Sequence, residues 1–99
     1  MISYNQEDMT LKQATITISG HVQGVFYRSH AQEEAKILAL TGYVKNLPNG
    51  NVEALAQGTE EQINSFIEWA RKGSPSAHVD NVDVTWQEIK QKFIGFEIF

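Results

Sequence analysis

The segment 14–28, ATITISGHVQGVFYR, decides the fold of this 99-residue chain. Its first part alternates apolar and polar residues, which is typical of a half-buried strand with Ala14, Ile16 and Ile18 on the buried face. Two glycines then interrupt the alternation, and apolar residues at helical spacing follow from Tyr27 onward. The segment therefore predicts a strand, a glycine-containing turn and the first turns of a helix.

The same periodicities, followed in both directions, predict the remaining elements. In chain order we expect a strand over 11–19, a helix over 27–40, strands over 43–47 and 51–57, a helix from 59 to 73, and strands through 82–86 and 94–98. Strand–helix–strand crossovers around a central hairpin describe the ferredoxin-like βαββαβ arrangement. The expected fold class is thus α+β: two helices on one face of a mixed, mainly antiparallel sheet, with an additional short C-terminal strand.

Turn and capping residues set the boundaries of these elements. Gly42 is expected to supply the left-handed residue that ends the first helix. Pro48-Asn49-Gly50 predicts the hairpin turn, because proline fixes φ and Asn-Gly tolerates positive φ. Thr59 with Gln62 forms a capping-box pattern that predicts the start of the second helix.

Composition restricts the classes of function. The net charge of −4 argues against nucleic acid as a partner, and the chain contains no cysteine for disulfides or thiolate chemistry. No apolar run approaches the roughly 20 residues that span a bilayer, and the polar N-terminus does not resemble a signal peptide. We expect a cytoplasmic protein without membrane contact, with residues 1–10 as a flexible extension and 11–99 as one domain.

The turn between the first strand and helix has the properties of an anion site. From Gly20 to Arg28, a turn leading into a helix leaves several backbone N–H groups without partners in the chain. Arg28 falls in the first helical turn, where the helix dipole disfavours a cation, and no acidic residue lies between Asp8 and Glu33. The alternative is an ordinary connection whose arginine points into water.

Asn46 is the second unusual residue. Asparagine is depleted within strands, yet Asn46 falls in the predicted strand 43–47 and shares a face with Val44. The alternative explanation is that Asn46 begins the turn at Pro48.

Together the two segments indicate a family. The pattern Gly20-x-Val-Gln-Gly-Val-x-Tyr-Arg28, followed by Asn46 within 42–53 (GYVKNLPNGNVE), resembles the acylphosphatases over nearly the whole chain from residue 11. The resemblance implies a monomeric enzyme that hydrolyses acyl phosphates without metal or cofactor, with inorganic phosphate or sulfate as competing ligands. It also assigns roles: Asn46 orients the attacking water, and the phosphate is bound by Arg28 and by the backbone amides of Gln23, Gly24, Val25, Phe26, Tyr27 and Arg28.

Two departures from the family pattern qualify the resemblance. Residues 73–75 read Gly-Ser-Pro where the family commonly has two consecutive prolines, and residues 96–99 read Phe-Glu-Ile-Phe where many members end in Ile-Arg-Tyr. We expect neither to reach the chemistry. His21 is expected to be exposed and His30 to pack near Arg28 or tune the site, and three scattered histidines predict no metal site. The alternative function is a non-catalytic module that binds a phosphorylated ligand, or a domain that handles carbamoyl phosphate.

Overall fold

The computed structural model describes residues 10–99, so nearly all of the predicted N-terminal extension lies outside the described residues. The elements are β1 (Lys12–His21), α1 (Tyr27–Ile37), β2 (Thr41–Asn46), β3 (Val52–Gly58), α2 (Glu60–Lys72), β4 (His78–Gln87) and β5 (Phe96–Ile98). Their order is the predicted one. No helix in this part of the chain is long and apolar enough to cross a membrane.

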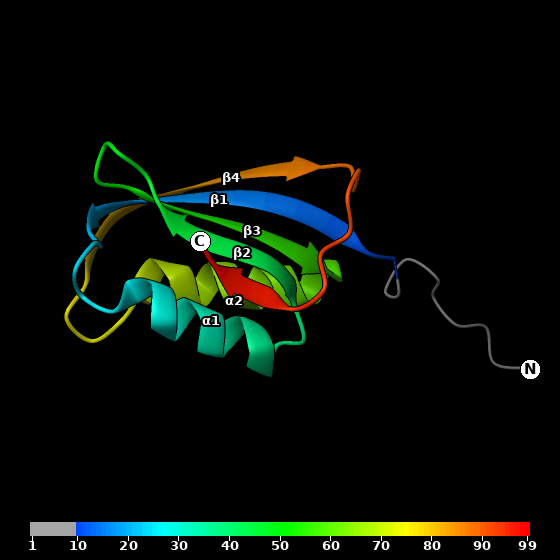
Figure 1. The fold of residues 1–99 in the computed structure, drawn as a ribbon, viewed down its shortest axis with the longest axis horizontal. Helices are drawn as coiled ribbons and strands as arrows, with labels where there is room; N and C mark the ends of the chain where they lie inside the picture. Colours follow the sequence, from blue (N-terminus) through cyan, green and yellow to red (C-terminus); the bar gives the residue numbers. More distant parts are fainter. Residues whose placement is uncertain (1–9) are drawn as a thin grey trace, which may run out of the picture.

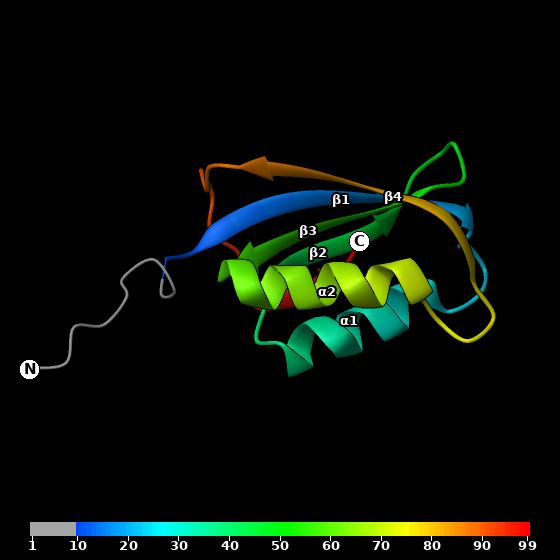
Figure 2. The same ribbon diagram turned by 180° about the vertical axis from the view of Figure 1, so that it is seen from behind.

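One five-stranded sheet, in the order β4-β1-β3-β2-β5, carries both helices on the same face (Figures 1 and 2). β1 pairs antiparallel with β3 and β4, β2 pairs antiparallel with β3, and β2 pairs parallel with β5. The predicted α+β arrangement, with its mixed sheet and short C-terminal strand, is confirmed.

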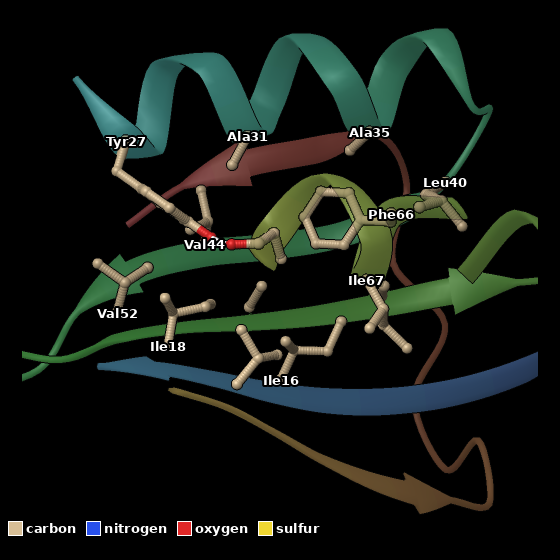
Figure 3. Close-up of a cluster of buried hydrophobic side chains, with 14 of the residues drawn as sticks. Ile16, Ile18, Tyr27, Ala31, Ala35, Leu40, Val44, Val52, Phe66 and Ile67 are labelled. Carbon is tan, nitrogen blue, oxygen red and sulfur yellow. Dashed lines mark hydrogen bonds between the residues drawn. The ribbon is translucent and has the colours of Figure 1, made fainter. Parts of the chain in front are cut away.

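The core lies between the sheet and the two helices (Figure 3). Ile16 and Ile18 of β1 are fully buried, as the alternation predicted, and α1 contributes Tyr27, Ala31 and Ala35. The buried face of α2 consists of the four predicted residues, Ile63, Phe66, Ile67 and Ala70. The two helices and the sheet therefore enclose a single hydrophobic cluster.

The end of α1 differs from the prediction. The helix ends at Ile37, not at residue 40, and Ala39 takes the left-handed conformation with φ of 59°. The amide of Leu40 donates to Ala35 O at 2.8 Å, which closes the helix and turns the Leu40 side chain into the core. Gly42 instead lies inside β2, where an added Cβ would be 1.8 Å from Leu55 O. Gly42 is required for close strand contact, so the prediction that it ends the helix was wrong.

The last strand is also shorter than predicted. β5 contains only Phe96–Ile98, and Ile94 is 95% exposed. The cause is topological, because β4 and β5 lie at opposite edges of the sheet and the connecting residues must cross its end. Gln57 holds this connection: its Oε1 accepts from Phe93 N at 3.0 Å and its Nε2 donates to Gln91 O at 2.6 Å.

The topology brings several loops to one end of the molecule. The β1–α1 loop, the β2–β3 turn and the α2–β4 connection all lie at the end where Figure 1 shows the loops in cyan, green and yellow. β5 runs parallel to β2, so its last residues reach the same end. Segments that are distant in the sequence can therefore form one site there.

Candidate active site

A small cavity of about 280 Å³ lies among these loops. It is lined by residues of the β1–α1 loop, the first turn of α1, the end of β2 and β5, namely Val22, Gly24, Phe26, Tyr27, Arg28, Ser29, Asn46 and Ile98. Arg28 and Asn46, which are 18 residues apart in the sequence, thus share one cavity. Of the other residues predicted for the site, Gly24, Phe26 and Tyr27 line the cavity, whereas Gln23 and Val25 do not.

The backbone of the β1–α1 loop presents unpaired donors. Within residues 10–99, no hydrogen bond has an amide of residues 23–28 as its donor. Phe26, the N-cap of α1, has left-handed φ and ψ of 61° and 23° and no side-chain cap, and the first turn of α1 has no acidic residue. These amides sit at the positive end of a helix dipole, an arrangement suited to an anion.

The loop is held from several sides. Val22 and Val25 are buried in the core. Gln23 Nε2 donates to Leu47 O and to Asn51 O, each at 2.8 Å, which ties the loop to the β2–β3 turn. Ser74 Oγ donates to Val25 O at 2.7 Å from the α2–β4 connection. Because its direction is fixed before any ligand arrives, the loop can bind an anion with little cost of reorganisation.

Tyr27 adds an anchor on α2. Its hydroxyl donates to Ala70 O at 2.8 Å, and its ring lies 5.1 Å from that of Trp69. Burial raises the pKa of Tyr27 well above its ordinary value, so the phenol stays neutral and protonated. Tyr27 therefore supports the start of α1 and offers no nucleophile.

Arg28 faces the cavity with one weak contact. Its Nη1 donates to the main-chain oxygen of Phe99 at 3.4 Å. Phe99 is held beside it, since its amide donates to Val44 O at 2.9 Å and its ring stacks on Tyr43 with centroids 5.0 Å apart. The C-terminal departure lies beside the site, since Phe99 contacts Arg28 and Ile98 lines the cavity, while the expectation that it does not reach the chemistry stays a prediction. The parallel pairing of β5 with β2 brings it there.

No Asp or Glu side chain of residues 10–99 pairs with Arg28. The ion pairs in residues 10–99 are Lys12–Glu60, Lys45–Glu53 and His78–Asp80. No group of three His, Cys, Asp or Glu side chains in that range is placed to hold a metal ion. The positive charge at the cavity is thus the guanidinium of Arg28 together with the amide dipoles.

Asn46 occupies the last position of β2, opposite Val52 of β3. Val44, which was predicted to share a face with Asn46, is fully buried, and Asn46 lines the cavity. Asn46 Oδ1 is buried and has no hydrogen-bond partner within residues 10–99. An unpaired buried acceptor costs about 1–3 kcal/mol, and such an atom is typically satisfied by a ligand or a water.

The histidines take structural positions. His21 is exposed, as predicted. His30 lies close to Phe26: its amide donates to Phe26 O at 3.2 Å and its Nδ1 is 2.9 Å from the same oxygen. His30 therefore packs against the start of α1, one of the two predicted roles.

Comparison with known proteins decides the family. A family model described as Acylphosphatase matches residues 14–98. The chain belongs to the acylphosphatase family. An "Acylphosphatase" from Pelotomaculum thermopropionicum is 38% identical over 90 residues, which span 91% of this chain and 98% of that relative. The crystal structure of acylphosphatase from Bacillus subtilis, 39% identical, has a TM-score of 0.86 and covers 91% of this chain and 99% of its own.

These similarities support an enzyme that hydrolyses acyl phosphates over the non-catalytic alternative. The crystal structure of T. kodakarensis HypF is also similar, with 31% identity and a TM-score of 0.79. That match spans 89% of this chain but only 12% of the other. The acylphosphatase relatives are instead matched along almost their whole length.

Sequence analysis missed several contributors to the site, among them Val22, Ser29 and Ile98 in the cavity wall. Alternation indicates that Ile98 shares a strand face with Phe96, but only the pairing of β5 with β2 locates it at the cavity. The side chain of Gln23 has a structural contact that its predicted backbone role did not include. Ser74 appeared only as a departure from the family pattern, and no local signal links it to Val25, 49 residues earlier.

Proposed function

We propose that the cavity binds the phosphoryl group of an acyl phosphate between Arg28 and the amides of residues 23–28, and that Asn46 orients the attacking water. The water oxygen forms a bond to phosphorus as the bond from phosphorus to the acyl oxygen breaks. The carboxylate leaves with the electron pair, and a water proton passes to a phosphate oxygen. The observation that carries this proposal is the unpaired, buried Oδ1 of Asn46 in the same cavity as Arg28.

Arg28 suits the phosphoryl group by its shape and charge. Guanidinium donors form a planar fork that can bind two phosphate oxygens at once. Among residues 10–99, the one hydrogen bond of the Arg28 guanidinium is the 3.4 Å contact from Nη1 to Phe99 O, which leaves its other donors for a ligand. The loop amides add directed donors for the remaining oxygens, and together they stabilise the charge of the transition state.

Asn46 acts by position. An amide does not titrate in water and is no general base, but its oxygen can accept a hydrogen bond from a water and fix its lone pair toward phosphorus. The unpaired Oδ1 supports this role, because a bound water would supply the missing partner.

The reaction requires no further acid and no metal under this proposal. A carboxylate is a good leaving group without protonation, so catalysis consists of positioning and charge stabilisation. Arg28 and the amides supply the positive charge, and turnover should be unchanged by EDTA. We further propose that inorganic phosphate and sulfate compete for the cavity and that the enzyme acts as a cytoplasmic monomer.

The test combines turnover with ligand-linked stability. Benzoyl phosphate should be hydrolysed, and inorganic phosphate at ten times its Kd should stabilise the fold by about 1.4 kcal/mol. For a domain of this size, that corresponds to a rise in Tm of roughly 6–11 °C. Sodium chloride at equal ionic strength is the control, since chloride cannot accept several directed hydrogen bonds. Equal shifts with both salts would contradict the proposed site.

A further inference from the structure

Ser74 is a buried polar residue with a single clear partner. It is 2% exposed, and its hydroxyl donates to Val25 O at 2.7 Å. It lies in the segment Gly73-Ser74-Pro75, which connects α2 to β4. Ser74 does not line the cavity, and neither does Val25. The hydrogen bond thus joins the β1–α1 loop to the α2–β4 connection through two residues outside the cavity wall.

Because a peptide bond is planar, a contact that fixes the Val25 carbonyl also fixes the Phe26 amide. A trans peptide is planar, with its C=O and N–H groups pointing in opposite directions. The chain has no cis peptide in the described residues, so the amide of Phe26 points away from the direction of the Val25 carbonyl. By holding that carbonyl, Ser74 also fixes the direction of the Phe26 amide, and Phe26 is one of the residues that line the cavity.

The next peptide is held in the same manner. Phe26 O accepts from His30 N at 3.2 Å and from Ser29 Oγ at 3.1 Å. The carbonyl oxygens on both sides of Phe26 are thus fixed, although Phe26 itself has a left-handed φ of 61° that is unfavourable for a side chain with a Cβ. Within the part of the chain that the structure describes, Val25 O accepts from Ser74 Oγ alone, so the first of these two peptides would lose that partner without Ser74.

The connection that carries Ser74 is itself rigid. Gly73 has φ of 76°, and an added Cβ there would lie 2.8 Å from Tyr27 Cε2, so this turn packs closely on the residue before Arg28. The main-chain oxygen of Ser74 accepts from Ala77 N at 3.0 Å. Ser74 can therefore restrain the loop.

We propose that Ser74 is a positioning residue for the phosphoryl site, which holds the Val25–Phe26 peptide so that the Phe26 amide donates to a phosphate oxygen. The inference rests on the proposed binding of phosphate by the loop amides. Losing one neutral hydrogen bond of this kind should weaken binding of inorganic phosphate about three- to tenfold.

Amide NMR during titration with inorganic phosphate tests the inference on the whole chain. In the wild type, phosphate should shift the Phe26 amide proton downfield. Ser74→Ala should reduce that shift and raise the Kd by the stated factor, while Ser74→Thr, which keeps a hydroxyl, should stay within about twofold of the wild type. Thr59→Ala is the control for stability, because it removes a cap at the opposite end of the molecule.

The outcomes separate the two proposals. An unchanged Kd and an unchanged Phe26 shift in Ser74→Ala overturn the role of Ser74 and leave the proposed function intact. An equal weakening in Thr59→Ala also overturns it, since the effect would then follow stability and not the orientation of the peptide. A wild-type protein that binds no phosphate overturns the proposed function itself.

Discussion

The chain passes from strand to helix twice on the same sheet, at β1–α1 and at β3–α2, and the two junctions treat their free amides differently. β1 and β3 are antiparallel neighbours, so the junctions lie at opposite ends of the molecule (Figures 1 and 2). Each helix begins with amides that have no partner within the helix. A junction whose amides are paired within the chain is structural, whereas a junction whose amides stay unpaired can bind a ligand.

At β3–α2 the chain satisfies its own donors. Thr59 Oγ1 accepts from Gln62 N at 3.2 Å, and Gln62 Oε1 accepts from Thr59 N at 2.9 Å. Glu60 and Glu61 in the first turn complement the helix dipole. At β1–α1 the N-cap is Phe26, with no side-chain cap, and the charged residue in the first turn is Arg28. The β1–α1 junction gives up this local stabilisation, and its donors remain available to a ligand.

Arg28 provides the largest expected effect. Arg28→Ala should lower kcat/KM for benzoyl phosphate by about 10³-fold or more, because it removes the charge and fork that grip the phosphoryl group. Arg28→Lys keeps the charge and should recover little, since a lysine cannot bind two oxygens in one plane. Circular dichroism should show an unchanged fold. A lysine variant with near-wild-type kcat/KM would contradict the bidentate role.

Asn46→Ala should lower kcat by about 10²-fold through lost positioning of the water. The inhibition constant for inorganic phosphate should change little, because Arg28 and the loop amides remain. Asn46→Asp is the matched control: it keeps the size of the side chain but adds a negative charge beside the substrate, and it should do no better. Normal kcat with weakened phosphate inhibition would show that Asn46 binds the phosphate and does not position the water.

The difference between the junctions was partly readable in the sequence. Thr59 to Gln62 is a local pattern, and the structure confirms the capping box that it predicted. Gly20 to Arg28 indicated free amides for the same reason, since spacing and residue type determine both. The order of elements, the hairpin and the buried face of α2 are also local or periodic signals, and they too are confirmed.

Features that depend on contacts between residues far apart in the chain could not be predicted from the sequence. Gly42 looked like a helix stop, but Leu55 of the neighbouring strand explains its presence. The contacts of Ser74 with Val25 and of Phe99 with Arg28 join residues 49 and 71 positions apart. No pattern in the sequence specifies such pairs before the fold is known. The cavity unites Arg28 with Asn46, while the chemical roles of both stay predictions.

A substitution at Ser29 can give the β1–α1 junction a side chain that satisfies its free amides, as the β3–α2 junction already has. It is the third residue of α1, the position that Gln62 holds in α2. Ser29→Glu should stabilise the ligand-free protein by about 0.3–1 kcal/mol, because a carboxylate then meets the free amides. The Kd for inorganic phosphate should rise at least about tenfold, since the carboxylate competes for the same donors and repels the anion.

Ser29→Gln separates charge from hydrogen bonding in that test, because it can bond to the amides without repelling phosphate. It should weaken phosphate binding less than Ser29→Glu does. Thermal unfolding without phosphate and calorimetric titration with phosphate measure the two quantities independently. If Ser29→Glu were more stable and bound phosphate as well as the wild type, the amides that stabilise the helix would not be those that bind the ligand.

Thr59→Ala provides the smallest effect on function and the sharpest contrast with Ser29→Glu. It removes the side chain that accepts from Gln62 N, which should cost about 1 kcal/mol of stability and lower the Tm by roughly 4–8 °C. The Kd for phosphate and the kcat for benzoyl phosphate, measured well below the Tm, should equal the wild-type values, because these amides face no ligand. A loss of turnover in folded Thr59→Ala would mean that the two ends of the molecule are coupled. Function could then not be assigned to the β1–α1 junction alone.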